Sequence, residues 1–131
     1  MVLRVAKVCV PANTPSDSPV VYVVELPQGV LTDIRILIPP GHFALTGIRI
    51  KYGLETITPW HQEEWVTGDS IVVQDFPNFR LPNDPSYLTV EAYNTDEVFE
   101  HCFYLYFIIK SEEELTTTLL SKFMRWLGFR G

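Results

Sequence analysis

The spacing of apolar residues changes once along this chain, at Ser111. Before Ser111, short apolar runs are separated by turns rich in proline and glycine, and several runs alternate apolar with polar residues, as β-strands with one buried face do. After Ser111, apolar residues recur three and four positions apart, which is typical of an amphipathic helix. The pattern predicts a β-rich body over 1–110 and one C-terminal helix over 111–131, both in a single domain.

About eight strands are expected in the body, at the spacing of a sandwich. Val20–Leu26 is almost continuously apolar, which predicts a strand covered on both faces. The turn at 94–97 (Asn-Thr-Asp-Glu) predicts a hairpin between the last two strands. Long loops between some neighbours favour an antiparallel β-sandwich of jelly-roll or Greek-key type over an up-and-down barrel. The expected strands are Val2–Val10, Val20–Leu26, Leu31–Ile38, Phe43–Tyr52, Glu55–Thr58, Asp69–Asp75, Tyr87–Asn94 and Val98–Lys110.

The C-terminal helix has a clear start signal. Ser111 followed by Glu114 predicts a capping box, in which each side chain bonds the backbone N–H of the other residue. A helix of about four turns is marginal alone in water, so its apolar stripe has to be buried on the sandwich, on a neighbouring subunit or on a membrane. Acidic residues in the first turn oppose the membrane. The helix residues expected at a contact are Leu119, Phe123, Trp126 and Leu127.

Composition excludes several classes of protein. The chain has 131 residues, which suits one domain. Its formal net charge of −6 disfavours a general nucleic-acid binder, which needs a basic surface. No apolar run reaches the ~20 residues that span a bilayer, and no signal peptide is visible. A protein made and used without secretion through a signal peptide is therefore expected.

Cys9 and Cys102 are the two cysteines, and each lies in an apolar strand. Two buried free thiols are the expected state. The alternative is one disulfide bond, which requires the first and last strands to be neighbours.

Trp60 and Trp65 lie on the loop between Pro59 and Asp69. Their rings could stack on a sugar, as in carbohydrate-binding modules with a sandwich fold. Alternatively they cap the open end of the sandwich or lie in a subunit interface, where tryptophan is enriched. Both tryptophans are therefore expected contact residues, with a glycan as the alternative ligand.

No metal site, cofactor site or catalytic site is predicted. The three histidines, His42, His61 and His101, lie on different segments without a metal-ligand spacing. Cys102 follows His101 directly, but neighbouring residues in a strand point to opposite faces, so the two cannot form a nucleophile–base pair.

Residues 38–59, reading IPPGHFALTGIRIKYGLETITP, are followed by Trp60, Glu64-Trp65 and Gly68-Asp69, and later by EAYNTDE and Glu100-His101. In these turns and aromatic residues, the stretch 31–109 resembles small β-sandwich structural proteins of tailed viruses of bacteria and archaea. The resemblance implies a virion component without catalytic residues, normally a homo-oligomer, such as a capsid decoration, head-fibre or tail-associated subunit. The C-terminal helix lies outside the resemblance.

The function expected from the sequence is that of a non-enzymatic structural subunit in a virus particle, located in the virion or in the cytoplasm before assembly. Its partners would be further copies of itself or other virion proteins. A binding module for carbohydrate or another surface ligand, using the Trp60–Trp65 loop, is the alternative.

Overall fold

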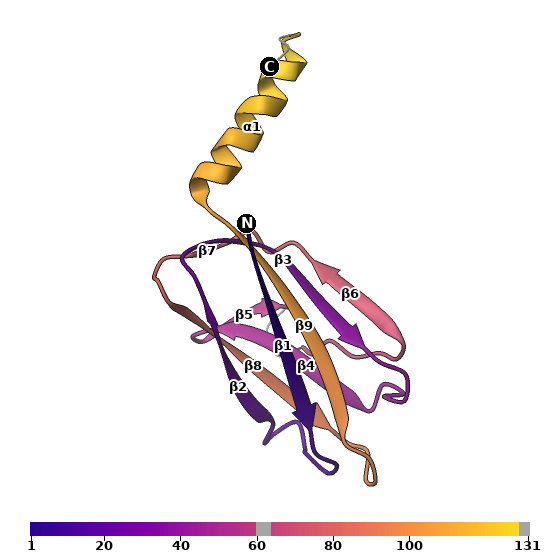
Figure 1. Ribbon diagram of the computed structural model, residues 1–131. Helices are drawn as coiled ribbons and strands as arrows, with labels where there is room; N and C mark the ends of the chain where they lie inside the picture. The colour runs from indigo at the N-terminus through magenta and orange to yellow at the C-terminus, as the bar shows by residue number, and fades with distance from the viewer. Residues whose placement is uncertain (60–63, 129–131) are drawn as a thin grey trace.

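The computed structural model describes residues 1–59 and 64–128, with the backbone alone for 116–118. It is a sandwich of two antiparallel sheets from which one helix extends (Figure 1). The elements are β1 (Val2–Val10), β2 (Val20–Leu26), β3 (Gly29–Ile38), β4 (Thr46–Tyr52), β5 (Glu55–Thr58), β6 (Ile71–Asp75), β7 (Phe79–Leu81), β8 (Ser86–Asn94), β9 (His101–Lys110) and α1 (Glu112–Trp126).

The two sheets have interleaved strand orders. One sheet runs β1-β9-β3-β6, with β7 also paired to β3, and the other runs β2-β8-β4-β5. The chain therefore passes from one sheet to the other at most of its turns, which is the arrangement of a jelly roll. The predicted all-β sandwich with a C-terminal helix is confirmed.

The core lies between the two sheets. In β9, buried residues alternate strictly with half-buried ones from His101 to Lys110, so one row of side chains faces inward. Phe103 and Phe107 of this row are fully buried and are the largest side chains in the core. Isoleucines of β3 lie beside them on the same sheet, and isoleucines of β4 belong to the opposite sheet. Their branched side chains suit a pleated, buried surface.

The predicted hairpin between the last two strands is wrong. β8 pairs with β2 and β4, whereas β9 pairs with β1 and β3 in the other sheet. The turn instead carries the chain across the sandwich. Asn94 fixes this crossing, because its buried side-chain amide donates to the carbonyl oxygens of Val10 (3.1 Å) and Phe99 (2.9 Å).

Two further expectations about strands need correction. β2 is not covered on both faces, because it is an edge strand with exposed Val21 and Val23. The short strand Phe79–Leu81 was not predicted, since three residues between prolines carry no readable alternation.

Across the described ranges, no helix combines the length and the apolar character needed to cross a membrane.

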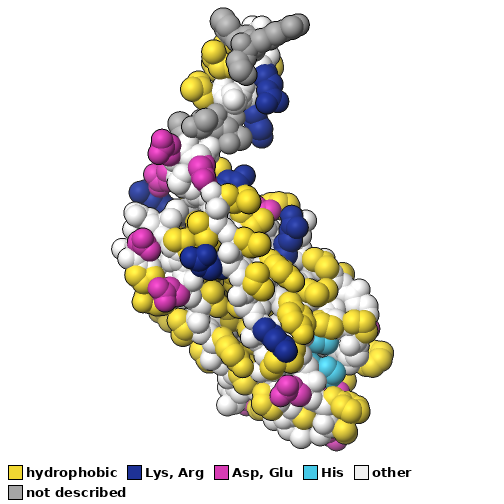
Figure 2. Space-filling model, viewed as in Figure 1, with side chains coloured by type: hydrophobic (Ala, Val, Ile, Leu, Met, Phe, Trp, Pro, Cys, Tyr) yellow, Lys and Arg dark blue, Asp and Glu magenta, His cyan; other side chains and the backbone are white. Residues whose placement is uncertain are grey.

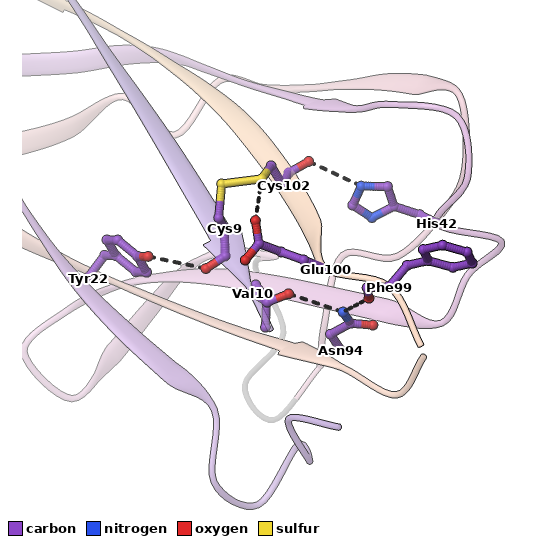
Figure 3. The surroundings of a disulfide bond; sticks show 8 residues. All are labelled: Cys9, Val10, Tyr22, His42, Asn94, Phe99, Glu100 and Cys102. Atoms are coloured by element: carbon purple, nitrogen blue, oxygen red, sulfur yellow. Dashed lines mark hydrogen bonds between the residues drawn. A yellow bond between two sulfur atoms is a disulfide. The ribbon is translucent and has the colours of Figure 1, made fainter. Parts of the chain in front are cut away.

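The expectation of two free thiols is also wrong. Cys9 and Cys102 are directly opposite each other on β1 and β9, and their sulfur atoms form a disulfide bond (Figure 3). The antiparallel register makes this pair close, with 4.0 Å between the Cα atoms. The condition set for the alternative, that the first and last strands be neighbours, is met.

We predict that replacing both cysteines (Cys9→Ala/Cys102→Ala) lowers the free energy of unfolding by about 3–5 kcal/mol. The bond joins residues 93 positions apart, so its loss restores a large amount of chain entropy to the unfolded state. Urea unfolding at one protein concentration measures the difference. A reducing agent should lower the midpoint of the natural chain and leave that of the variant unchanged; equal midpoints for both chains without reductant would contradict the prediction.

Candidate functional site

The start of α1 is fixed to the sandwich. Ser111 Oγ accepts from the Glu114 N–H and Glu114 Oε2 accepts from the Ser111 N–H, both at 3.0 Å, so the predicted capping box is confirmed. The Arg80 guanidinium pairs with Glu112 at 2.9 Å, and the amino group of Met1 pairs with Glu114. These contacts tie the first turn of the helix to β7 and to the N-terminus.

Only Ser111 separates the last strand from the helix. β9 ends at Lys110, Ser111 is extended with φ −69° and ψ 154°, and α1 begins at Glu112. A helix that reverses onto the face of its own sandwich needs a longer connection than one residue. The helix therefore leaves the end of the sandwich and extends away from it (Figure 1).

The apolar side of α1 is exposed. Leu119 is 66% exposed, Phe123 55%, Trp126 80% and Leu127 48%, while Leu120 and Met124 widen the same side. In the view of Figure 2, hydrophobic side chains gather on one side of the helix and basic side chains on the other. The four helix residues expected at a contact thus lie together on one unburied surface, and the described part of the sandwich does not cover them.

A groove of about 560 Å³ lies where the helix leaves the body. Leu115 and Leu119 form its helical wall, and Val30 and Phe76 belong to its opposite wall. Its lining is more apolar than polar, and Leu115 is only half-buried there. The groove extends the apolar surface of α1 down to β3.

Trp65 packs on the outer face of its own sandwich. The Arg49 guanidinium lies over its ring at 4.1 Å from the centroid, and Tyr93 meets it edge-on at 4.9 Å. Arg49 is held in turn by Glu91 at 3.0 Å. The ring of Tyr93 occupies the space above Gly47, where an added Cβ would lie 2.2 Å from it. The face of Trp65 that carries Arg49 is therefore not free for a sugar ring.

Trp60 and His61 lie outside the described residues. Of the two tryptophans expected at a contact on this loop, the structure describes only Trp65.

Two of the three histidines converge, which their positions in the sequence did not indicate. The His42 and His101 rings are 4.6 Å apart. The His42 ring nitrogens contact Thr46 Oγ1 (2.6 Å) and the Cys102 carbonyl oxygen (3.1 Å), and His101 Nε2 contacts Asp96 Oδ2 at 2.8 Å. These three nitrogens already have protein partners. The two histidines therefore close one end of the core with hydrogen bonds inside the protein.

A second group of potential ligands contains Cys9, Glu100 and Cys102, whose ligand atoms lie within 4.8 Å of one another. Because both sulfurs are bonded to each other, neither is available as a thiolate ligand or a nucleophile. His101 points into the core while Cys102 lies on the outer face, as predicted for neighbouring strand residues.

Burial lowers the pKa of His42, and the neighbouring His101 lowers it further. The Cys102 carbonyl and the Asp69 carboxylate act in the opposite direction but are weaker. Asp69 itself has a lowered pKa because it accepts from the backbone N–H groups of Phe43 and Gly41. A buried, neutral His42 is thus part of the stable state of this end of the sandwich.

No protein-family model matches this chain, and no curated protein matches it either. The candidate functional surface therefore rests on the geometry: an anchored helix with an exposed apolar side and a groove at its base.

We predict that the free energy of unfolding decreases as the pH falls below 6.5, and that His42→Gln makes this decrease smaller. The unfolded state binds a proton on His42 near its ordinary pKa of 6.5, whereas the folded state resists protonation because its pKa is lowered. The contribution of His42 to the free energy of unfolding is therefore fully present above pH 6.5 and decreases as the pH falls below that value. Asp69 and Asp96, whose pKa values lie below 3.8, act in a separate, more acidic window.

Urea unfolding at pH 7.5, 6.5 and 5.5 checks this prediction. Glutamine keeps hydrogen-bonding capacity towards Thr46 and the Cys102 carbonyl but does not titrate. The same loss of stability with falling pH in both chains would show that His42 is not responsible.

Proposed function

We propose that this protein is a non-enzymatic structural subunit that assembles with further copies of itself through α1, as a component of a virus particle such as a capsid decoration, head-fibre or tail-associated subunit. One observation carries the proposal: a helix anchored at its first turn exposes a continuous apolar side that its own sandwich does not cover. Such surfaces mark sites of protein contact.

The amount of exposed surface supports a partner for the helix. The chain has an accessible surface of 8105 Å², whereas a compact protein of 15.1 kDa is expected to expose about 7,100 Å². The excess of roughly 1,000 Å² is close to the ~800 Å² that each partner contributes to a standard interface.

The chemistry of the helix also suits a protein interface. Phe123 and Trp126 stack on each other at 6.3 Å between ring centroids, and Trp126 is the most exposed of the contact residues named on α1. Aromatic side chains dominate the energetics of interfaces because each removes a large area from water. A 15-residue helix gains most of its stability from packing of this kind rather than from intrinsic propensity.

The virion is proposed from the resemblance of residues 31–109, since jelly rolls also occur in lectins and cupins and the fold alone does not select a function. Among these classes, sugar binding gains no support from Trp65, whose ring is covered by Arg49 on one face. The helix surface, by contrast, needs a macromolecular partner.

We predict that the natural chain is an oligomer in solution and that Leu119→Glu/Phe123→Glu reduces its mass. Both side chains are exposed in the single chain, so the substitutions should leave the sandwich folded while placing charges in the helix contact. Size exclusion with light scattering measures the mass, and circular dichroism checks the fold.

Ser121→Glu is the control, because it adds a negative charge on the polar side of the same helix. Its oligomer should have the mass of the natural chain. A natural chain that has a mass of 15.1 kDa at all concentrations, or an equal loss of mass in the control, would count against the proposal.

A further inference from the structure

Strand β2 is an edge strand that lacks the usual protection of an edge. It pairs with β8 on one side, and among the described residues no strand lies on its other side. It is seven residues long, reads VVYVVEL, and keeps a continuous register with β8 without a bulge. Val21 is 58% exposed and Val23 65%. Natural proteins avoid long, regular, apolar edges unless another chain pairs with them.

The other described edges of the sandwich are protected. β1 carries Arg4 and Lys7, and Arg4 stands in the row that otherwise faces the core. β5 has four residues and an irregular register with β4. β6 and β7 have five and three residues. Charge, shortness and irregularity are the common means of blocking edge pairing. The segment Val20–Val24 of β2 has none of these, and this sets the strand apart.

We propose that β2 pairs antiparallel with β2 of a second copy of this chain, so that the two four-stranded sheets join into one continuous sheet across a twofold axis. This contact uses a surface separate from α1 and does not depend on the role proposed for the helix.

The sequence of β2 argues for a second copy as the occupant. Val20–Val24 reads Val-Val-Tyr-Val-Val and is the same in both directions around Tyr22. In an antiparallel pair centred on Tyr22, Val21 lies opposite Val23 of the partner strand, and Val20 opposite Val24. The valine pairs are then apolar on both faces of the sheet, and the Tyr22 rings of the two strands meet at the axis. Apolar and aromatic cross-strand pairs are a favourable arrangement.

The charges of the strand agree with this register. The one acidic residue, Glu25, falls outside the five paired positions and opposite Pro19, so the two glutamates of a pair stay apart. Pairing of β1 with itself would instead bring charged side chains into the contact, and charges on an edge strand oppose edge pairing. Around the middle residue of the strand, Ala6, Arg4 would lie opposite Val8. Lys7 would lie opposite Val5 in the same register. The side of the sandwich where β1 and β2 lie therefore favours self-pairing through β2.

The experiment measures mass by light scattering in full-length chains carrying the helix substitutions Leu119→Glu/Phe123→Glu. With the helix contact removed, we expect a species of twice the 15.1 kDa of one chain at high concentration. Adding Val21→Lys/Val23→Lys should halve this mass. The control, Leu3→Lys/Val5→Lys, places the same charges at similarly exposed apolar residues of β1 and should leave the dimer intact.

The outcomes separate this inference from the proposed function. A monomeric helix variant, from a natural chain that is an oligomer, overturns the β2 contact and leaves the helix role standing. A natural chain and a helix variant that are both dimers, with the β2 lysine variant monomeric, support the β2 contact and overturn the helix role. Loss of the dimer in the β1 control to the same extent would also overturn the β2 contact.

Cross-linking provides a second measurement that introduces no charge. Both natural cysteines are in the disulfide bond, so Val21→Cys and Val23→Cys each add a single free thiol. Under oxidation, a mixture of the two variants should give a covalent dimer several-fold more than either variant alone, because position 21 lies opposite position 23 in the proposed register. Equal amounts in the mixture and in the separate variants would overturn that register.

Discussion

The position of β9 between β1 and β3 determines most of this structure. Its inward row supplies the largest buried side chains of the core, and its outer row carries one half of the disulfide bond. Its last residue, Lys110, is one residue away from the helix. Because β9 is central in its sheet and runs to the end of the sandwich, the chain leaves the body at that end. The exposed position of α1 follows from this exit rather than from any property of the helix itself.

Local patterns in the sequence predicted what depends on local interactions. The bounds of β1, β2 and β5 agree with the alternation and turn residues read from the chain, and Ser111 with Glu114 marked the start of the helix. What could not be predicted is long-range. The composition of residues 94–97 signals a change of chain direction. It does not tell whether the next strand pairs with β8 or crosses to the other sheet. That choice depends on long-range packing, in which the inward row of β9 packs against the inward rows of the other sheet.

The same reason explains the two cysteines, the histidine pair and the exposed face of β2. Cys9 and Cys102 are bonded because the β1–β9 register places them opposite each other. The spacing of residues in the sequence does not reveal which residues of two distant strands pair. His42 and His101 meet because the loop after β3 lies against the start of β9. A continuous apolar run indicated a strand covered on both faces, but β2 lies at the edge of its sheet with Val21 and Val23 exposed, because its place in the sheet depends on long-range pairing with β8. The candidate helix surface was predicted more fully, since helical spacing alone places its apolar residues together.

The two proposed contacts have different directions, which constrains the assembly they form. α1 extends beyond one end of the sandwich, whereas β2 lies along its side (Figure 1). A strand pair around a twofold axis is isologous and closes after two chains, because each edge is used once. A helix contact at the end of each sandwich then links such pairs to one another, and the angle between the two contacts decides whether the chain of pairs closes into a ring or continues.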